Sequence, residues 1–163
     1  MLAGIQEART KQQARTACGV HRISSGAFKG HYGCELWVNL EAAYATTGAD
    51  HRPHFLQPKN CATLIAEPRV LFVKIVAALI NVTVAVLHVP YQDTKGDSVE
   101  KEKQRVLYWK RLVDFFVQFP PDIVFVDANG RLGDTSSEAV GTAGYAQCED
   151  DNGRRLHELC FGV

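Results

Sequence analysis

The first half of the chain is dominated by short apolar runs rich in valine, isoleucine and other β-favouring residues, separated by polar or glycine-containing segments. Runs of this length and composition predict strands rather than helices. The predicted strands are residues 34–38, 61–66, 70–77 and 82–89, with the last two forming a hairpin around Asn81. The stretch between the first two predicted strands, to about Lys59, is expected to be irregular.

From residue 98 the apolar positions take up the period of a helix. One stripe is predicted to comprise Val106, Trp109, Val113 and Phe116, flanked by Leu112, Phe115 and Phe119. Asp97 or Ser98 is placed to cap the start of this helix, and Pro120-Pro121 ends it. The pattern therefore predicts one amphipathic helix over residues 98–119.

A short strand and a second helix are predicted after the two prolines. Residues 122–126 are an apolar run that leads into a turn at Asp127, Asn129 and Gly130. A loop of small residues is expected over 133–144, followed by a short helix at 154–160. Helix, strand and acidic turn in this order indicate an α/β fold.

Residues 70–89 have about the length of a membrane-spanning helix and are almost continuously apolar. Lys74, Thr83 and His88 interrupt the run, and its β-branched residues favour two buried strands. Residues 1–16 have no apolar core of the kind found in a signal peptide. We therefore expect a nuclear or cytoplasmic protein that is neither secreted nor inserted in a membrane.

The amino-acid composition excludes few classes of protein. With 163 residues and 46% hydrophobic content, one globular domain is expected. Lys plus Arg and Asp plus Glu number 18 each, so the whole chain has no net field to attract a polyanion, although a local basic patch remains open. The five cysteines lack a C-x-x-C pair, which argues against a zinc site and favours reduced, mostly buried thiols.

Two acidic residues at predicted strand ends are candidates for metal chemistry. Glu7 follows a very short apolar start, and Asp127 follows the run 122–126. Carboxylate oxygens are the ligands that magnesium prefers, and one or two of them suffice when water and substrate phosphate complete the shell. Taken singly, Glu7 is more simply a solvated loop residue and Asp127 a turn former.

The order of several short motifs resembles the endonuclease/exonuclease/phosphatase superfamily, specifically the apurinic-type endonuclease domain of LINE-like retrotransposons. The matching motifs are Gln6-Glu7, His88-Val89-Pro90, Val126-Asp127-Ala128-Asn129, the run from Gly30 to Val38, and Asn152-Gly153 with Leu156. Val126 stands where the family has glycine, His88 where many members have tyrosine, and Tyr91 where many have asparagine. The resemblance implies an incomplete four-layer α/β sandwich, in which two mainly antiparallel sheets are flanked by helices.

The resemblance also implies roles for individual residues. Glu7 would hold Mg²⁺ or Mn²⁺, and Asp127 would orient and deprotonate the attacking water. Asn129 would hold Asp127 or a phosphate oxygen, His88 would donate to the phosphate, and Tyr91 and Asn152 would contact the substrate. DNA would be the partner of an active enzyme, with a reverse transcriptase domain in the parent polyprotein.

The family's first strand, with its asparagine, and its last strands, with an aspartate and a Ser/Asp-His pair, have no counterpart here. We therefore expect residues 1–163 to be a single partial domain, truncated at both ends, with an open sheet edge and a Mg-dependent endonuclease site that truncation could inactivate. Two alternatives stay open: a noncatalytic, degenerate remnant of the fold, and a phosphatase of the same superfamily acting on small molecules or lipids.

Overall fold

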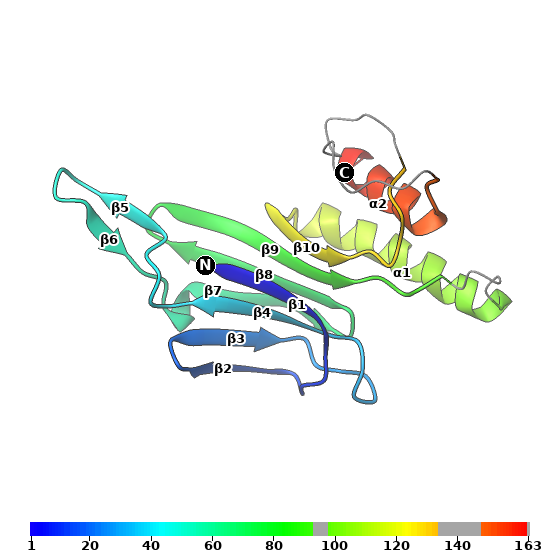
Figure 1. Cartoon of the computed structure of the whole chain (residues 1–163), viewed down its shortest axis with the longest axis horizontal. Coiled ribbons are helices and arrows are strands. Elements are labelled where there is room, and N and C mark those ends of the chain that lie inside the picture. Colours follow the sequence, from blue (N-terminus) through cyan, green and yellow to red (C-terminus); the bar gives the residue numbers. More distant parts are fainter. Residues whose placement is uncertain (93–97, 134–147, 163) are drawn as a thin grey trace. The chain divides into compact units, whose positions relative to one another are not determined.

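The computed structural model of the chain describes residues 1–92, 98–133 and 148–162. These residues form a mixed α/β structure with three sheets, mostly antiparallel, and two helices (Figure 1). The chain divides into two compact units. Unit 1 comprises Met1–His88 and Pro121–Val126, and unit 2 comprises Val89–Pro120 and Asp127–Val163. Whether the chain is one partial domain therefore stays a prediction.

The first sheet of unit 1 is built from the beginning of the chain. Its strands are β1 (Leu2–Ala8), β2 (Gln13–Ala17), β3 (Val20–Ser24) and β4 (Gly33–Asn39). They lie in the order β1-β4-β3-β2, and every neighbouring pair is antiparallel. The predicted strand 34–38 is confirmed as β4. The very short apolar start before Glu7 is part of β1, which spans seven residues, so Glu7 lies within this strand and not beyond its end.

The second sheet of unit 1 contains the most apolar strands. They are β7 (Cys61–Glu67), β8 (Val70–Ala77), β9 (Ile80–His88) and β10 (Ile123–Asp127), in the order β10-β9-β8-β7. β7, β8 and β9 are antiparallel neighbours, which confirms the predicted hairpin, although its turn lies just before Asn81. β10 runs in the same direction as β9, since Asp122 N donates to Thr83 O at one end and Val89 N to Asp127 O at the other.

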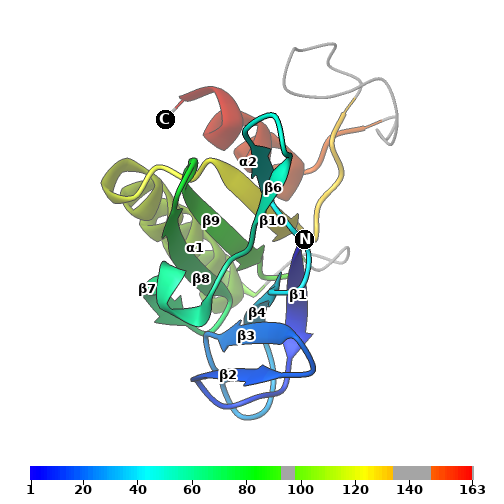
Figure 2. The same cartoon turned by 90° about the vertical axis from the view of Figure 1, so that its left-hand side faces the viewer.

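The core of unit 1 lies between these two sheets, whose separation is clear from the end-on direction (Figure 2). Leu36 and Val38 of the first sheet pack with Val73, Val84 and Val86 of the second, and all five side chains are fully buried. Alternation explains this packing, because every second residue of a strand faces the same way. Continuous burial of β8 and β9 is what their apolar runs predicted.

A small hairpin separates the two sheets in sequence. It consists of β5 (Ala45–Thr47) and β6 (Arg52–His54), and the 3-10 helix η1 (Pro58–Asn60) follows it. The expectation of an irregular segment up to Lys59 is therefore wrong for these residues. Polar side chains and Pro53 hide the alternation by which strands are recognised.

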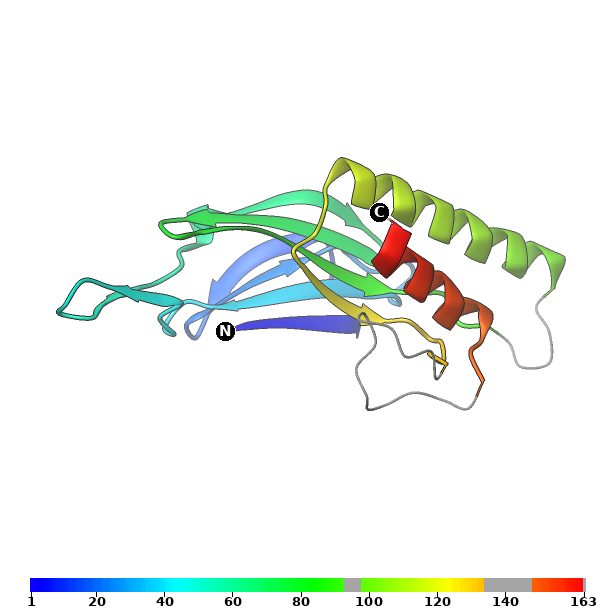
Figure 3. The ribbon, with the colours of Figure 1, turned by 90° about the horizontal axis from the view of Figure 1, so that it is seen from above.

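Unit 2 contains both helices, α1 (Val99–Gln118) and α2 (Asp151–Gly162), which lie side by side (Figure 3). Both helices occur where the sequence predicts them, and α2 begins three residues earlier than expected. Ser98 caps α1, because its Oγ accepts a hydrogen bond from Lys101 N; the alternative cap Asp97 lies outside the described residues. The predicted loop is likewise outside them from residue 134 to 144. Neither helix in the described part of the chain is long and apolar enough to span a membrane.

The buried stripe of α1 differs from the predicted one. Its buried residues are Arg105, Trp109, Leu112 and Phe116. Val106 and Val113 remain 39% and 42% exposed, so their assignment to the buried stripe is wrong. Arg105 takes their place because its guanidinium pairs with Asp151 of α2, and a buried cation is tolerated when it is paired.

Candidate functional site

Glu7 lies at an irregularity in β1. The register with β4 pairs Ile5 with Glu35 and then Ala8 with Gly33, which makes a bulge at Gln6 and Glu7. Glu7 has φ of 55°, a left-handed conformation that is uncommon for a residue with a side chain. Gly33 permits the close pairing, since a Cβ there would overlap the carbonyl oxygen of Ala8. The Glu7 side chain emerges 74% exposed.

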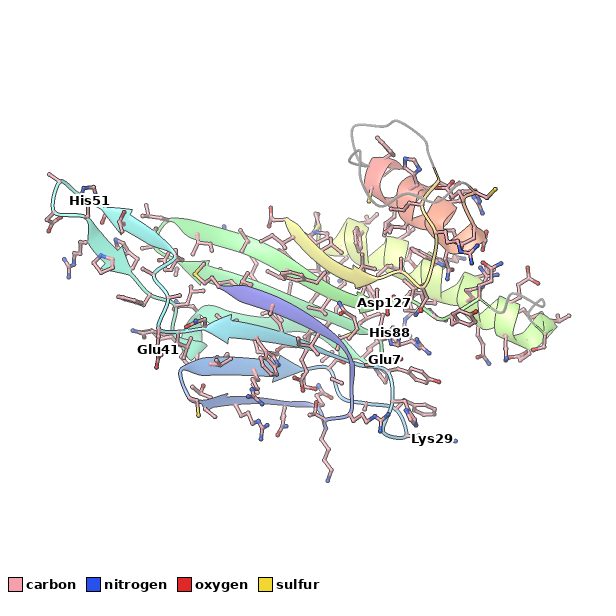
Figure 4. The ribbon with its side chains drawn as sticks, in the orientation of Figure 1. Glu7, Lys29, Glu41, His51, His88 and Asp127 are labelled. Carbon is pink, nitrogen blue, oxygen red and sulfur yellow. The ribbon has the colours of Figure 1, made fainter. Side chains whose placement is uncertain are left out.

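His88 lies beside this carboxylate (Figure 4), and its Nε2 is 3.8 Å from Glu7 Oε1. It is the last residue of β9, and its side chain is only 4% exposed. Its backbone N donates to Arg69 O at 2.9 Å. His88 is thus buried at the end of a strand and has a ring nitrogen near an exposed carboxylate.

Arg69 and Tyr32 complete the surroundings of His88. Arg69 Nη1 donates to His88 O at 3.3 Å and lies 3.5 Å from His88 Nδ1. Because a guanidinium only donates, Nδ1 is the acceptor in this contact, and Nε2 is the nitrogen that faces Glu7. The guanidinium also stacks 3.7 Å from the centroid of the Tyr32 ring. We call Glu7, Tyr32, Arg69 and His88 the Glu7 corner.

Glu35 anchors the chain that follows the bulge. It is 6% exposed, and its Oε1 accepts from Thr10 Oγ1 at 2.6 Å while its Oε2 accepts from Trp37 Nε1 at 2.6 Å. Charge-assisted bonds of this kind are short and strong. The Thr10 bond ties the segment after Glu7 to β4, so Glu35 restrains the bulge from a distance.

Sequence reasoning missed Glu35, Arg69 and Tyr32. Arg69 follows Pro68 in the turn between two predicted strands, but its sequence gives no sign that it reaches His88. Tyr32 lies in a loop and has φ of 67°. These contacts join segments that are distant in the chain, and no local pattern encodes them.

The predicted acidic turn belongs to unit 2, where it is tied to the segment after β9. Asp127 Oδ1 accepts from Asn129 N at 3.0 Å, which is the local turn expected of aspartate. Asn129 Nδ2 donates to Val89 O at 2.8 Å, and Asn129 has φ of 44°. The amide of Asn129 thus holds the turn in place, as a partner of the backbone.

Asn152 is entirely buried at the start of α2. Its Nδ2 donates to Pro90 O at 3.0 Å and to Asn129 O at 3.1 Å, and its Oδ1 accepts from Trp109 Nε1 at 3.1 Å. We call this arrangement the Asn152 brace. Tyr91, the other residue predicted to contact substrate, is 63% exposed. As placed, Asn152 acts on the turn through Asn129, whereas Tyr91 is open to solvent.

Asp151, next to the Asn152 brace, forms ion pairs with three arginines. It accepts hydrogen bonds from Arg105, Arg154 and Arg155. Burial opposes ionisation of this carboxyl, but the three guanidinium donors outweigh burial and hold its pKa well below the usual range. The ion pairs join α1 to the first turn of α2.

The donor set bears on the expected metal ion. Among residues 1–92, 98–133 and 148–162 there is no group of three or more His, Cys, Asp or Glu side chains that could hold a metal. Glu7 nevertheless supplies one exposed, ionisable carboxylate in unit 1. Magnesium is commonly held by one or two carboxylates with water and substrate phosphate, so these residues fit an ion shared with substrate rather than a closed cage.

The cysteine closest to the Glu7 corner in its electrostatics is Cys34, whose pKa is influenced by Arg69. All five cysteines are free, and burial raises the pKa of Cys34 to about 12, although Arg69 acts in the opposite direction. A thiol with such a pKa is protonated at neutral pH and is a poor nucleophile. The expectation of mostly buried thiols is wrong, because Cys18, Cys148 and Cys160 are exposed.

Comparison with known proteins adds no family assignment: a scan against models of protein families matches none, and a search of curated proteins finds no match.

Proposed function

We propose that this chain is a metal-dependent phosphodiesterase of the endonuclease/exonuclease/phosphatase type, acting on DNA in the nucleus or cytoplasm. The observation that carries the proposal is the Glu7 corner. An exposed carboxylate on a strained backbone lies 3.8 Å from the Nε2 of a buried histidine. Strained backbone concentrates at functional sites, and an exposed carboxylate beside an imidazole N–H matches metal and phosphate chemistry.

The finer architecture is part of the same proposal. Two face-to-face sheets in unit 1 agree with the central layers of a four-layer α/β sandwich. A sandwich of this kind also needs helices, and unit 2 supplies α1 and α2. A parent polyprotein with a reverse transcriptase domain would be the wider setting of a DNA-cleaving domain.

In the proposed reaction Glu7 would hold Mg²⁺ or Mn²⁺, which supplies charge neutralisation at the phosphoryl oxygens when bound. His88, with its proton on Nε2, would donate a hydrogen bond to a phosphate oxygen. Asp127 would orient and deprotonate the attacking water, a contribution worth about a hundredfold to ten-thousandfold in rate. Asn129 would keep the Asp127 turn in its present conformation, as its bond to Val89 O already does.

Plasmid nicking tests this proposal. Supercoiled plasmid is incubated with the full chain and Mg²⁺, with EDTA as the metal-free arm, and open-circle product is measured. We expect nicking by the wild type and a loss of at least a hundredfold in Glu7→Gln, His88→Asn and Asp127→Asn. Glu41→Gln is the matched control, since Glu41 is an exposed glutamate at the opposite end of the first sheet from Glu7 (Figure 4).

Two results would overturn the proposal. One is nicking of equal rate by wild type and Glu7→Gln, which would show a contaminating nuclease. The other is a folded wild type without activity in Mg²⁺ or Mn²⁺.

The second candidate is a noncatalytic protein that keeps the fold and serves in binding. The specific observation in its favour is that the described residues contain no group of three metal-ligating side chains. A wild type that folds cooperatively, shows no thermal shift with Mg²⁺ or Mn²⁺, and leaves plasmid intact would select this candidate.

A further inference from the structure

Charge is unevenly distributed along the chain, although the total is balanced. Between Glu7 and Glu35 there is no aspartate or glutamate, and the same segment contains five lysines and arginines. They are Arg9, Lys11, Arg15, Arg22 and Lys29. This segment builds β2, β3 and their flanking loops; Arg15 and Arg22 are on the two strands, and the other three basic residues are in the loops.

The register of the sheet places the central arginines on one face. Arg15 of β2 is directly opposite Arg22 of β3, and Arg22 is in turn opposite Trp37 of β4. Their neighbours Ile23 and Leu36 point into the core of unit 1. Because side chains alternate along a strand, Arg15, Arg22 and Trp37 form a row on the face of the sheet away from that core.

The pairing of Arg15 with Arg22 is unfavourable for the stability of the sheet. Like charges directly opposite in an antiparallel pair destabilise it. In the described part of the chain, no carboxylate pairs with Arg15 or Arg22. Glu35 is two register pairs away and therefore on the same face, but its two oxygens accept from Thr10 and Trp37. Arg15 and Arg22 are thus cross-strand neighbours of like charge, and neither has a carboxylate partner among the described residues.

Arg22 is held in a specific conformation. Its guanidinium carbon lies 4.2 Å from the centroid of the Trp37 ring, while the indole N–H is fixed by Glu35. Its Nε is buried and has no hydrogen-bond partner among the described residues. A buried donor without a partner is costly and rare in native proteins. Because Arg15 is exposed and Arg22 is half-buried, an anion from outside would offset the repulsion between these two like charges.

We propose that the row Arg15-Arg22-Trp37, with the basic loops beside it, is a binding surface for single-stranded nucleic acid. The guanidinium groups supply contacts to phosphates, and the stacked Arg22 and Trp37 planes supply a platform for unpaired bases. A duplex would present only its backbone to this flat face, which is why a single strand is the expected occupant. The row shares no residue with the Glu7 corner, and nucleic-acid binding needs no metal ion, so the inference does not rest on hydrolysis.

Fluorescence anisotropy in EDTA tests this inference without interference from cleavage. A labelled oligothymidylate of about 12 nucleotides, within the range that one small binding fold covers, is titrated with the full chain over a series of salt concentrations. The variant is Arg15→Gln/Arg22→Gln. The control is Arg52→Gln/Lys59→Gln, which removes the same charge from exposed positions on β6 and η1.

We expect the variant to bind at least tenfold more weakly at low salt, and the slope of log affinity against log salt to fall by about 1.4 for two lost phosphate contacts. The control should keep the wild-type slope. Arg15→Gln alone should also raise the unfolding midpoint slightly, because it removes a like-charge pair. Near-ultraviolet circular dichroism establishes that each variant is folded.

Three outcomes would overturn the inference: equal weakening in the variant and control pairs, equal affinity for a duplex of the same length, or equal binding of polyglutamate. The first would indicate nonspecific attraction to the chain, the second a backbone contact without base stacking, and the third a general polyanion effect. Because binding is measured without metal, an inactive chain would still support or reject this surface.

Discussion

The Glu7 corner and the Asn152 brace use polar residues in opposite ways. In the brace, the Asn152 amide is fully buried and each of its polar atoms has a partner within unit 2. In the corner, the Glu7 carboxylate is 74% exposed on a residue with positive φ, and its neighbour His88 is buried. The polar groups of the brace therefore stabilise the fold, whereas the Glu7 carboxylate in the corner is accessible to a ligand.

Glu7 and Asn152 differ in this way although the sequence analysis made both of them candidate site residues. Both Glu7 and Asn152 were expected to contact substrate or metal, and both stand in short motifs of the same resemblance. A satisfied amide rigidifies the elements that it joins, while a strained, exposed side chain is the kind of feature found where function requires it. Substitutions at the two places should accordingly differ in what they damage.

Asn152→Leu should have the largest effect on stability. The substitution leaves Trp109 Nε1 and the carbonyls of Pro90 and Asn129 without their amide partner in a buried place. We expect the free energy of unfolding to fall by about 3 kcal/mol or more. Urea denaturation measures it, with Asn81→Leu as an exposed control expected within about 0.5 kcal/mol of wild type. A small change in the free energy of unfolding of Asn152→Leu would show that the hydrogen bonds of the brace do not stabilise the fold.

Asp151→Asn should have the second-largest effect on stability. We expect the free energy of unfolding to fall by about 2–3 kcal/mol at neutral pH, because the carboxylate that pairs with buried Arg105 is neutralised. The 26% exposure of the Asp151 side chain moderates this value. Its depressed pKa in the folded state means that the stabilisation is complete above the unfolded value of about 3.9 and is lost as pH falls below it. The wild-type and variant stability curves should therefore converge in acid; parallel curves from pH 7 to pH 2 would contradict this.

Gly4→Ala should cost about 1–3 kcal/mol through overpacking in unit 1. A Cβ at Gly4 would overlap the Phe125 side chain, so β1 or the ring must shift. Thermal unfolding measures the change, and Ala3→Ser at the neighbouring exposed position is the control. An unchanged midpoint in Gly4→Ala would mean that β1 does not approach Phe125 as closely as described.

Glu7→Gln should have the smallest effect on stability, within about 0.5 kcal/mol of wild type, because the carboxylate is largely solvated. The same variant is expected to lose activity in the nicking assay. Denaturant unfolding measures the first quantity. A large destabilisation would show that Glu7 stabilises the fold. Glu7 and Asn152 would then no longer differ in their structural role.

The strands and helices were readable from the sequence wherever the apolar pattern was strong. β8 has the bounds that its run of valine, leucine and isoleucine predicts, and α1 begins and ends within a residue of the predicted limits. β5 and β6 were missed because Arg52, Pro53 and His54 show no apolar alternation. The buried face of α1 was misassigned because burial of Arg105 depends on Asp151, which is distant in sequence.

The candidate site was predictable only in its residue types. Gln6-Glu7 and Asp127-Ala128-Asn129 mark strand ends in the sequence, but the bulge that turns Glu7 outward depends on pairing with β4. The contacts of Arg69 and Tyr32 with His88 likewise depend on tertiary structure. Backbone strain and long-range partners have no local signature, which is why these parts could not be anticipated.

The most direct test of the account asks whether Glu7 holds a divalent ion. In a titration with Mn²⁺ followed by ¹H–¹⁵N spectra, the paramagnetic ion broadens amide signals near its binding place. We predict that the signals of Glu7, Ala8 and His88 broaden first, that Glu7→Gln abolishes this, and that Glu41→Gln leaves it unchanged. Broadening that begins at the acidic residues 149–151, or that persists in Glu7→Gln, would contradict the central claim.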